Sequence, residues 1–112
     1  MSSMITEVFY LTRDNTVDLV LKADSIPVDL RSATKVEVLD TDCTWAVDSV
    51  ASPDAFVIGG VDGRITLQFG GETINAGTYK CQVIVYDPTN VNGVVWGEIQ
   101  LAIKRSCPVA AP

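Results

Sequence analysis

The stretch Ala76-Gly77-Thr78-Tyr79-Lys80-Cys81-Gln82-Val83-Ile84-Val85-Tyr86 decides the fold. Gly77 allows a backbone turn without a Cβ clash, and the residues after it alternate with a period of two. On one face of the resulting strand lie the expected core residues, Tyr79, Cys81, Val83 and Val85. On the other face lie Lys80, Gln82, Ile84 and Tyr86. The pattern predicts a central β-strand that begins just after a turn.

The spacing of a tyrosine and a cysteine makes this strand more specific. Tyr79 stands two residues before Cys81 and directly after a turn. This arrangement is typical of the corner strand of an immunoglobulin-like sandwich. The alternative is an ordinary central strand of any antiparallel sheet, and the stretch alone does not separate the two. It indicates a scaffold and carries no chemistry of its own.

Short alternating stretches recur at even spacing along the rest of the chain. Turn residues such as Asp62-Gly63 and Asn92-Gly93 separate them. The expected strands cover residues 7–11, 16–22, 35–39, 43–47, 55–58, 64–69, 76–86 and 94–103. About seven to eight short strands without helical periodicity predict an all-β fold, an antiparallel sandwich of immunoglobulin-like topology.

Size and charge limit the kind of molecule. The 112 residues, 47% of them hydrophobic, predict one domain over residues 1–112 with a single core. Residues 1–6 are expected to form an N-terminal arm and residues 105–112 an extended C-terminal tail, and such ends often order against a partner. The net charge of −6 argues against nucleic acid or an anionic membrane as the partner. No membrane span or secretory signal is visible, which predicts folding in a reducing cytosol.

Three cysteines give an odd count. Cys43 and Cys81 fall in two expected core strands, where a bridge between the sheets is conceivable, and Cys107 falls in the tail. In a reducing compartment, buried free thiols are the favoured interpretation. Cys43, Cys81 and Tyr79 are therefore expected to be core residues.

The residues that commonly carry catalysis are missing or scattered. The chain has no histidine, which removes the commonest general base and the usual zinc sets. No Cys-x-x-Cys pair and no phosphate-binding glycine loop occurs. Aspartates gather in expected loops (40, 42, 48, 54 and 62) without a calcium-loop pattern, so turn roles explain them better than metal binding or a paired-carboxylate hydrolase. We expect no enzymatic activity, no cofactor and no metal.

Apolar side chains expected on outer strand faces form the candidate interface: Trp96, Tyr86, Ile84 and Val20. Trp96 and Tyr86 should be neighbours across the hairpin that joins the last two strands. Aromatic residues are enriched at interface centres, so the pair predicts a contact patch. The alternatives are a covering layer or a register that differs by one residue, which would turn the side chains inward.

Several stretches resemble the immunoglobulin-like domains of tailed-bacteriophage virion proteins, in particular the N-terminal domain of baseplate upper proteins. Residues 11–21 resemble the first strand, the turn and the second strand of that family, with Asp14-Asn15 in place of a Gly-Asp pair. Residues 27–36 resemble its Pro-Val-Asp-Leu-Thr-Gly-Ala-Thr segment, with Arg31-Ser32 in place of Thr-Gly. Residues 62–65 and 76–80 match its glycine positions.

The resemblance implies a structural role in a virion assembled in the host cytoplasm. The expected function is that of a capsid decoration protein or a tail or baseplate attachment module, bound to a larger virion protein and possibly to copies of itself. Baseplate proteins continue into further parts where this sequence stops, which leaves a small accessory role open. The alternative is a carbohydrate- or host-surface-binding module in which Trp96 and Tyr86 stack on a sugar.

Overall fold

The computed structural model describes residues 6–11, 13, 15–23, 25–72 and 74–105. Within these ranges the regular secondary structure is β-strand apart from one 3-10 turn, η1 (Pro53–Ala55). The larger sheet has five strands in the order β1-β10-β9-β5-β6. Their bounds are Thr6–Leu11 (β1), Val94–Arg105 (β10), Gly77–Tyr86 (β9), Lys35–Asp40 (β5) and Ala46–Asp48 (β6). The predicted all-β class is confirmed.

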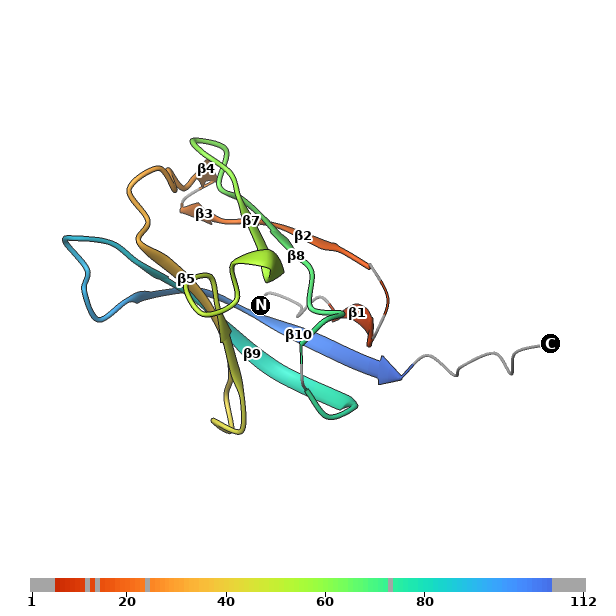
Figure 1. The fold of residues 1–112 in the computed structure, drawn as a ribbon. Helices are drawn as coiled ribbons and strands as arrows, with labels where there is room; N and C mark the ends of the chain where they lie inside the picture. Colours follow the sequence, from red (N-terminus) through yellow and green to blue (C-terminus); the bar gives the residue numbers. More distant parts are fainter. Residues whose placement is uncertain (1–5, 12, 14, 24, 73, 106–112) are drawn as a thin grey trace.

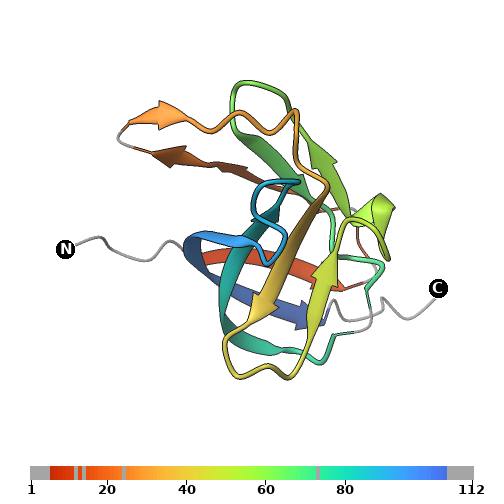
Figure 2. The same ribbon diagram turned by 90° about the vertical axis from the view of Figure 1, so that its left-hand side faces the viewer.

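A smaller sheet of three strands, in the order β2-β8-β7, lies across from the larger one (Figure 1). The bounds are Val17–Val20 for β2, Arg64–Leu67 for β8 and Phe56–Ile58 for β7. After β2 the chain forms a two-stranded ribbon of β3 (Lys22–Ala23) and β4 (Ile26–Pro27), which projects from the body of the molecule (Figure 2). None of the described helical residues makes a helix of the length and apolarity that a bilayer crossing needs.

The two sheets enclose one hydrophobic core because each turns an alternating apolar face toward the other. The buried residues of the larger sheet include Val36, Val38, Cys81, Val83, Leu101 and Ile103, and those of the smaller sheet include Val17, Ile65 and Leu67. Phe9 stacks on Phe69 with ring centroids 5.1 Å apart. Each buried side chain of this size stabilises the fold by about 1.5–3 kcal/mol. The core face predicted for residues 76–86, most of which form β9, is confirmed.

β1 pairs with β10 in parallel, from Thr6 beside Gln100 to Leu11 beside Arg105. β10 in turn pairs antiparallel with β9, as the predicted hairpin requires. The chain therefore begins its first strand beside the middle of its last one. This pairing leaves β2, the next strand along, in the opposite sheet.

Tyr79 closes the corner before β9. Its hydroxyl donates a hydrogen bond to the backbone carbonyl of Asn75 at 2.7 Å. A tyrosine two residues before a buried cysteine that bonds back to upstream backbone is a feature of immunoglobulin-like sandwiches. The two sheets also resemble that topology, with β2, β8 and β7 in one layer and β5, β9 and β10 in the other. Tyr79 packs against the core and Cys81 is fully buried, as predicted.

Cys43 does not belong to the core, and the strand predicted over residues 43–47 is wrong at its start. β6 begins only at Ala46. The N–H of Cys43 donates to the carbonyl of Asp40 at 2.7 Å, and Cys43 has φ +58° and an exposed side chain. The turn extends this far because Asp40 is buried and its carboxylate accepts a hydrogen bond from the Thr44 hydroxyl.

Cys43 and Cys81 are both free thiols, so no bridge joins them. Burial is the main cause that raises the pKa of the Cys81 thiol to about 12, and the negative charge of Asp40 is the second cause. Cys107, residues 1–5 of the predicted arm and the tail from residue 106 lie outside the described residues.

Candidate interface around Tyr86

Tyr86 ends β9 on the outer face of the larger sheet, as predicted. Val83 and Val85 of the same strand are buried in the core, and Tyr86 is paired with Lys35 of β5. Because Val36 and Val38 of β5 point into the core, Lys35 and Glu37 share the outer face with Tyr86.

Three groups hold the Tyr86 side chain and backbone in place. The hydroxyl donates a hydrogen bond to Oε1 of Glu37 at 2.8 Å. Nζ of Lys35 lies 4.2 Å from the centre of the ring, which is a cation–π contact. The backbone carbonyl of Tyr86 accepts from the N–H of Thr34 at 2.8 Å. The bond to Glu37, with partial burial and the charges of Glu37 and Asp48, raises the pKa of Tyr86.

The loop between β9 and β10 is ordered by its first residue. Oδ1 of Asp87 accepts hydrogen bonds from the backbone N–H groups of Thr89 and Asn90, at 2.9 and 2.7 Å. The bond from the Asn90 N–H, the bonds from the Asn90 side-chain amide and then the bond from Thr89 hold the pKa of Asp87 below its ordinary value. The N–H of Gly93 then donates to the carbonyl of Asn90 at 3.1 Å, which closes the loop. The loop is a fixed surface feature, as the predicted turn residues indicate.

Apolar side chains from two loops surround the exposed edge of Tyr86. A shallow hollow here is lined by Thr34, Lys35, Val50, Tyr86, Asp87, Pro88 and Val91. Val50 and Val91 are 67% and 71% exposed, which is high for valine. We call Lys35, Val50, Tyr86, Pro88 and Val91 the Tyr86 patch. It presents an oriented aromatic ring among exposed apolar groups, with one lysine beside it.

Ile84 lies on the same outer face as Tyr86 but is covered, so its predicted exposure is wrong. Only 7% of Ile84 is exposed. Gly93 lies against it, since a Cβ built on this glycine would come 2.6 Å from Cγ2 of Ile84 and 2.9 Å from Cε2 of Tyr86. The loop that returns into β10 therefore covers Ile84 and also lies beside the Tyr86 ring.

Trp96 is not a neighbour of Tyr86 on the outer face, and this prediction is wrong. The pairing of β10 with β9 shifts between Val95 and Gly97, which is a β-bulge. The extra residue, Trp96, packs against the core from the inner side, and Val95 takes the outer position opposite Ile84. The two-ring platform expected for a sugar is therefore not formed.

Val20 is exposed, as predicted, but on the other sheet. Val20 belongs to β2 and is 48% exposed. Asp18, two residues before it on the same face of β2, accepts a hydrogen bond from the Thr66 hydroxyl at 2.7 Å on the outer face of the smaller sheet. Of the four residues in the predicted interface, only Tyr86 thus lies in the Tyr86 patch. The sequence analysis missed Val50, Pro88 and Val91 because loop residues carry no periodic signal, although an exposed valine within a turn is unusual enough to attract attention.

Asp48 and Asp62, two of the loop aspartates, serve turns, as predicted. Oδ1 of Asp48 accepts from the N–H groups of Val50 and Ala51 at 2.9 and 2.8 Å, which also positions Val50 beside Tyr86. Oδ1 of Asp62 accepts from the N–H of Arg64 at 3.3 Å. Over the described ranges, no three residues of the His, Cys, Asp and Glu types gather closely enough to hold a metal ion.

No family model matches the chain, and a search of curated proteins finds no relative of it.

Proposed function

We propose that this chain is a non-enzymatic, immunoglobulin-like structural protein of a tailed bacteriophage particle, bound to a larger virion protein as a decoration or attachment module. The observation that carries the binding role is the Tyr86 patch. Its ring is oriented by Glu37 and Lys35 before any partner arrives, so little side-chain freedom is lost on binding. Aromatic residues are enriched at the centres of protein–protein contacts, and Val50 and Val91 add exposed apolar area around this one.

The setting in a virion rests on the sequence resemblance, and two structural features are compatible with it. The Tyr79–Asn75 hydrogen bond and the order of the strands fit an immunoglobulin-like sandwich. The resembling segments also take up structural positions, since residues 62–65 form the turn into β8 and its start, and residues 76–80 form the start of β9. The glycan-binding alternative loses its support because Trp96 and Tyr86 do not share a face.

The role is tested on particles of the phage that encodes the chain. Mass spectrometry of purified particles should find the chain at a fixed ratio to one larger virion protein. Val91→Asp should lower its incorporation about tenfold or more, since a charge in the centre of a contact is strongly unfavourable. Val57→Asp is the matched control, because Val57 is also an exposed valine, 56% accessible, on the opposite sheet. Particles that lack the chain, or equal incorporation of both variants, would contradict the proposal.

A further inference from the structure

Among the residues that the structure describes, β2 has a neighbouring strand on one side only. It is an edge strand of the smaller sheet, and β8 is the strand to which it is hydrogen-bonded. The N–H of Leu21, just after β2, donates to the carbonyl of Gly63, just before β8, at 2.9 Å. The backbone of Leu21 therefore bonds toward the β8 side, and so does that of Leu19, two residues before it. Because bonding directions alternate along an antiparallel strand, the backbone groups of Asp18 and Val20 point to the free side. Such an edge is a template for another extended chain.

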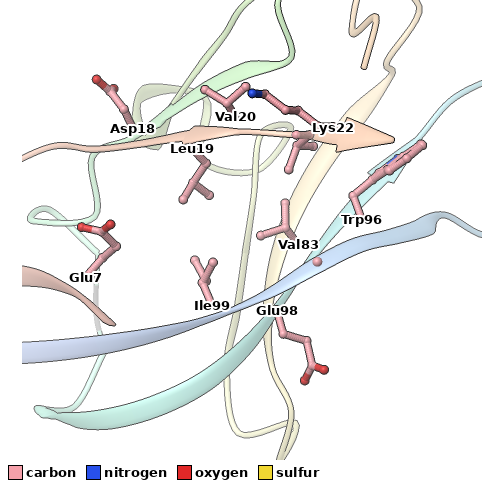
Figure 3. Close-up of a pocket in the computed structure, with 11 residues that line it drawn as sticks. Glu7, Asp18, Leu19, Val20, Lys22, Val83, Trp96, Glu98 and Ile99 are labelled. Atoms are coloured by element: carbon pink, nitrogen blue, oxygen red, sulfur yellow. The ribbon is translucent and has the colours of Figure 1, made fainter. Parts of the chain in front are cut away.

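A groove of about 360 Å³ lies beside this free edge, between β2 and β10 (Figure 3). Figure 3 shows Leu19 pointing from β2 toward Ile99 of β10, with Val83 beside them. Trp96 stands at one end of the groove and Glu7 at the other (Figure 3). The β-bulge is what places the Trp96 ring here, and the result is an apolar floor with an aromatic end.

Glu7 is a half-buried polar residue of the groove that has no evident structural role. It shares the inner face of β1 with Phe9, which is fully buried, and it is itself half-buried. Within the described part of the chain, no hydrogen bond or ion pair reaches its carboxylate. A carboxylate in such surroundings favours a positively charged partner, because burial without one is costly.

The strand register fixes the spacing that an occupant must have. Glu7 pairs with Leu101, and Ile99 and Gly97 lie two and four residues back along β10. Side chains of an extended segment face one side at every second residue. A strand added antiparallel to β2 would therefore present two apolar side chains and then a basic one, in the order apolar-x-apolar-x-Lys or Arg.

We propose, on the basis of the function proposed above, that this groove receives an extended segment of the larger partner protein. The segment adds as a strand to the free edge of β2, with its apolar side chains over Leu19 and Ile99 and its basic side chain at Glu7. Backbone bonds supply affinity in this mode of recognition, and the alternate side chains supply specificity. The Tyr86 patch and the groove are then two separate contacts on opposite sides of the larger sheet.

The test uses the peptide acetyl-Thr-Ile-Thr-Val-Thr-Lys-Thr-amide and the full chain carrying Trp45→Phe, so that Trp96 is the remaining indole. Saturable binding should change the Trp96 emission and protect it from acrylamide. The same peptide with glutamate in place of lysine should bind about tenfold more weakly or worse. Glu7→Gln should reduce this preference to about threefold or less. Glu98→Gln should leave it unchanged, because Glu98 also lines the groove but its side chain is exposed and points away from Leu19 and Val83 (Figure 3).

Gly97→Val supplies an independent block. A Cβ at Gly97 meets no atom within 4 Å apart from its chain neighbours, and Gly97 lines the groove, so the valine side chain should occupy part of it. Cooperative unfolding should persist while peptide binding is lost. If Trp45→Phe does not fold, amide chemical shifts of Asp18 and Val20 in the unmodified chain give the same information.

Several results would overturn the inference. One is the lack of saturable binding at peptide concentrations up to the millimolar range, and another is binding that Gly97→Val does not weaken. A third is a Trp96 that is already protected from acrylamide in the free chain, as it would be if residues 1–5 occupied the groove. These outcomes are distinct from failure of the proposed function. If the Gly97→Val variant is incorporated into particles at the full level, the role of the groove alone is refuted. If the unmodified chain binds the peptide and yet is absent from particles, the virion role alone is refuted.

Discussion

Gly93 lies directly against Ile84, so closely that a Cβ on the glycine would come within 2.6 Å of Cγ2 of the isoleucine. Gly93 also has φ +82°, a region that disfavours residues with a side chain. Gly93→Ala should therefore destabilise the fold by about 1–3 kcal/mol in urea unfolding. Gly71→Ala, where a Cβ meets nothing within 4 Å, should change stability by less than about 0.5 kcal/mol. Equal effects would show that the loop does not press on Ile84.

The bond from Tyr79 to Asn75 predicts a graded pair of substitutions. Tyr79→Phe keeps the ring against Trp45, whose centroid is 5.4 Å away, and removes only the hydroxyl. The loss should be about 0.5–1.5 kcal/mol. Tyr79→Ala also removes the ring and should cost about 3–5 kcal/mol. Thermal and urea unfolding measure both, and an unchanged stability of Tyr79→Phe would mean that the corner hydrogen bond contributes nothing.

The raised pKa of Tyr86 predicts how the patch responds to alkali. The folded state holds the phenol proton more tightly than the unfolded chain does, so this contribution to stability is complete below the unfolded pKa of about 10. It is lost as the pH rises through the higher folded pKa. Glu37→Gln should move the pKa of Tyr86 down toward its ordinary value, followed by the ring 13Cζ shift in an NMR titration. Glu98→Gln removes an exposed carboxylate without touching the hydroxyl and should have little effect.

The two described cysteines should differ sharply in reactivity. In a Cys107→Ser background at pH 8, Cys43 should react with a thiol reagent within minutes, since it is exposed, and Cys81 only on unfolding. The pKa of Cys81, raised to about 12 from 9.0, means that its contribution to stability is complete below about pH 9 and falls between pH 9 and 12. Cys81→Ala should lose that part of the alkaline destabilisation. Rapid labelling of Cys81 in the folded chain would refute its burial.

The faces of β5, β8 and β9 were predictable because strict alternation and the inward requirement of one core leave a single solution. Val38, Ile65 and Val83 are examples, each 0–1% exposed. The Tyr79–Cys81 spacing likewise predicted the corner. Such local patterns are enough to assign which residues of a strand face the core. The turns at Asp62-Gly63 and Asn92-Gly93 indicated where β8 and β10 begin.

The candidate site was less predictable, for two physical reasons. Trp96 is an extra residue in β10, so the residues before it point to the opposite face from the one that simple alternation predicts. The only sequence signal for this bulge is Gly97 inside a strand. The Tyr86 patch combines Val50 and Val91 from separate loops, which only the completed sandwich brings together. Neither effect is a property of a local window of sequence.

The parallel pairing of β1 with β10 has a mechanical consequence. The backbone enters β1 at Thr6 and leaves β10 at Arg105, at opposite ends of a six-residue ladder about 20 Å long. Tension between these two points loads the rungs of that ladder in shear, all at once, instead of opening them one by one as in a zipper. A domain connected in this way resists being pulled apart along the direction in which its two ends depart.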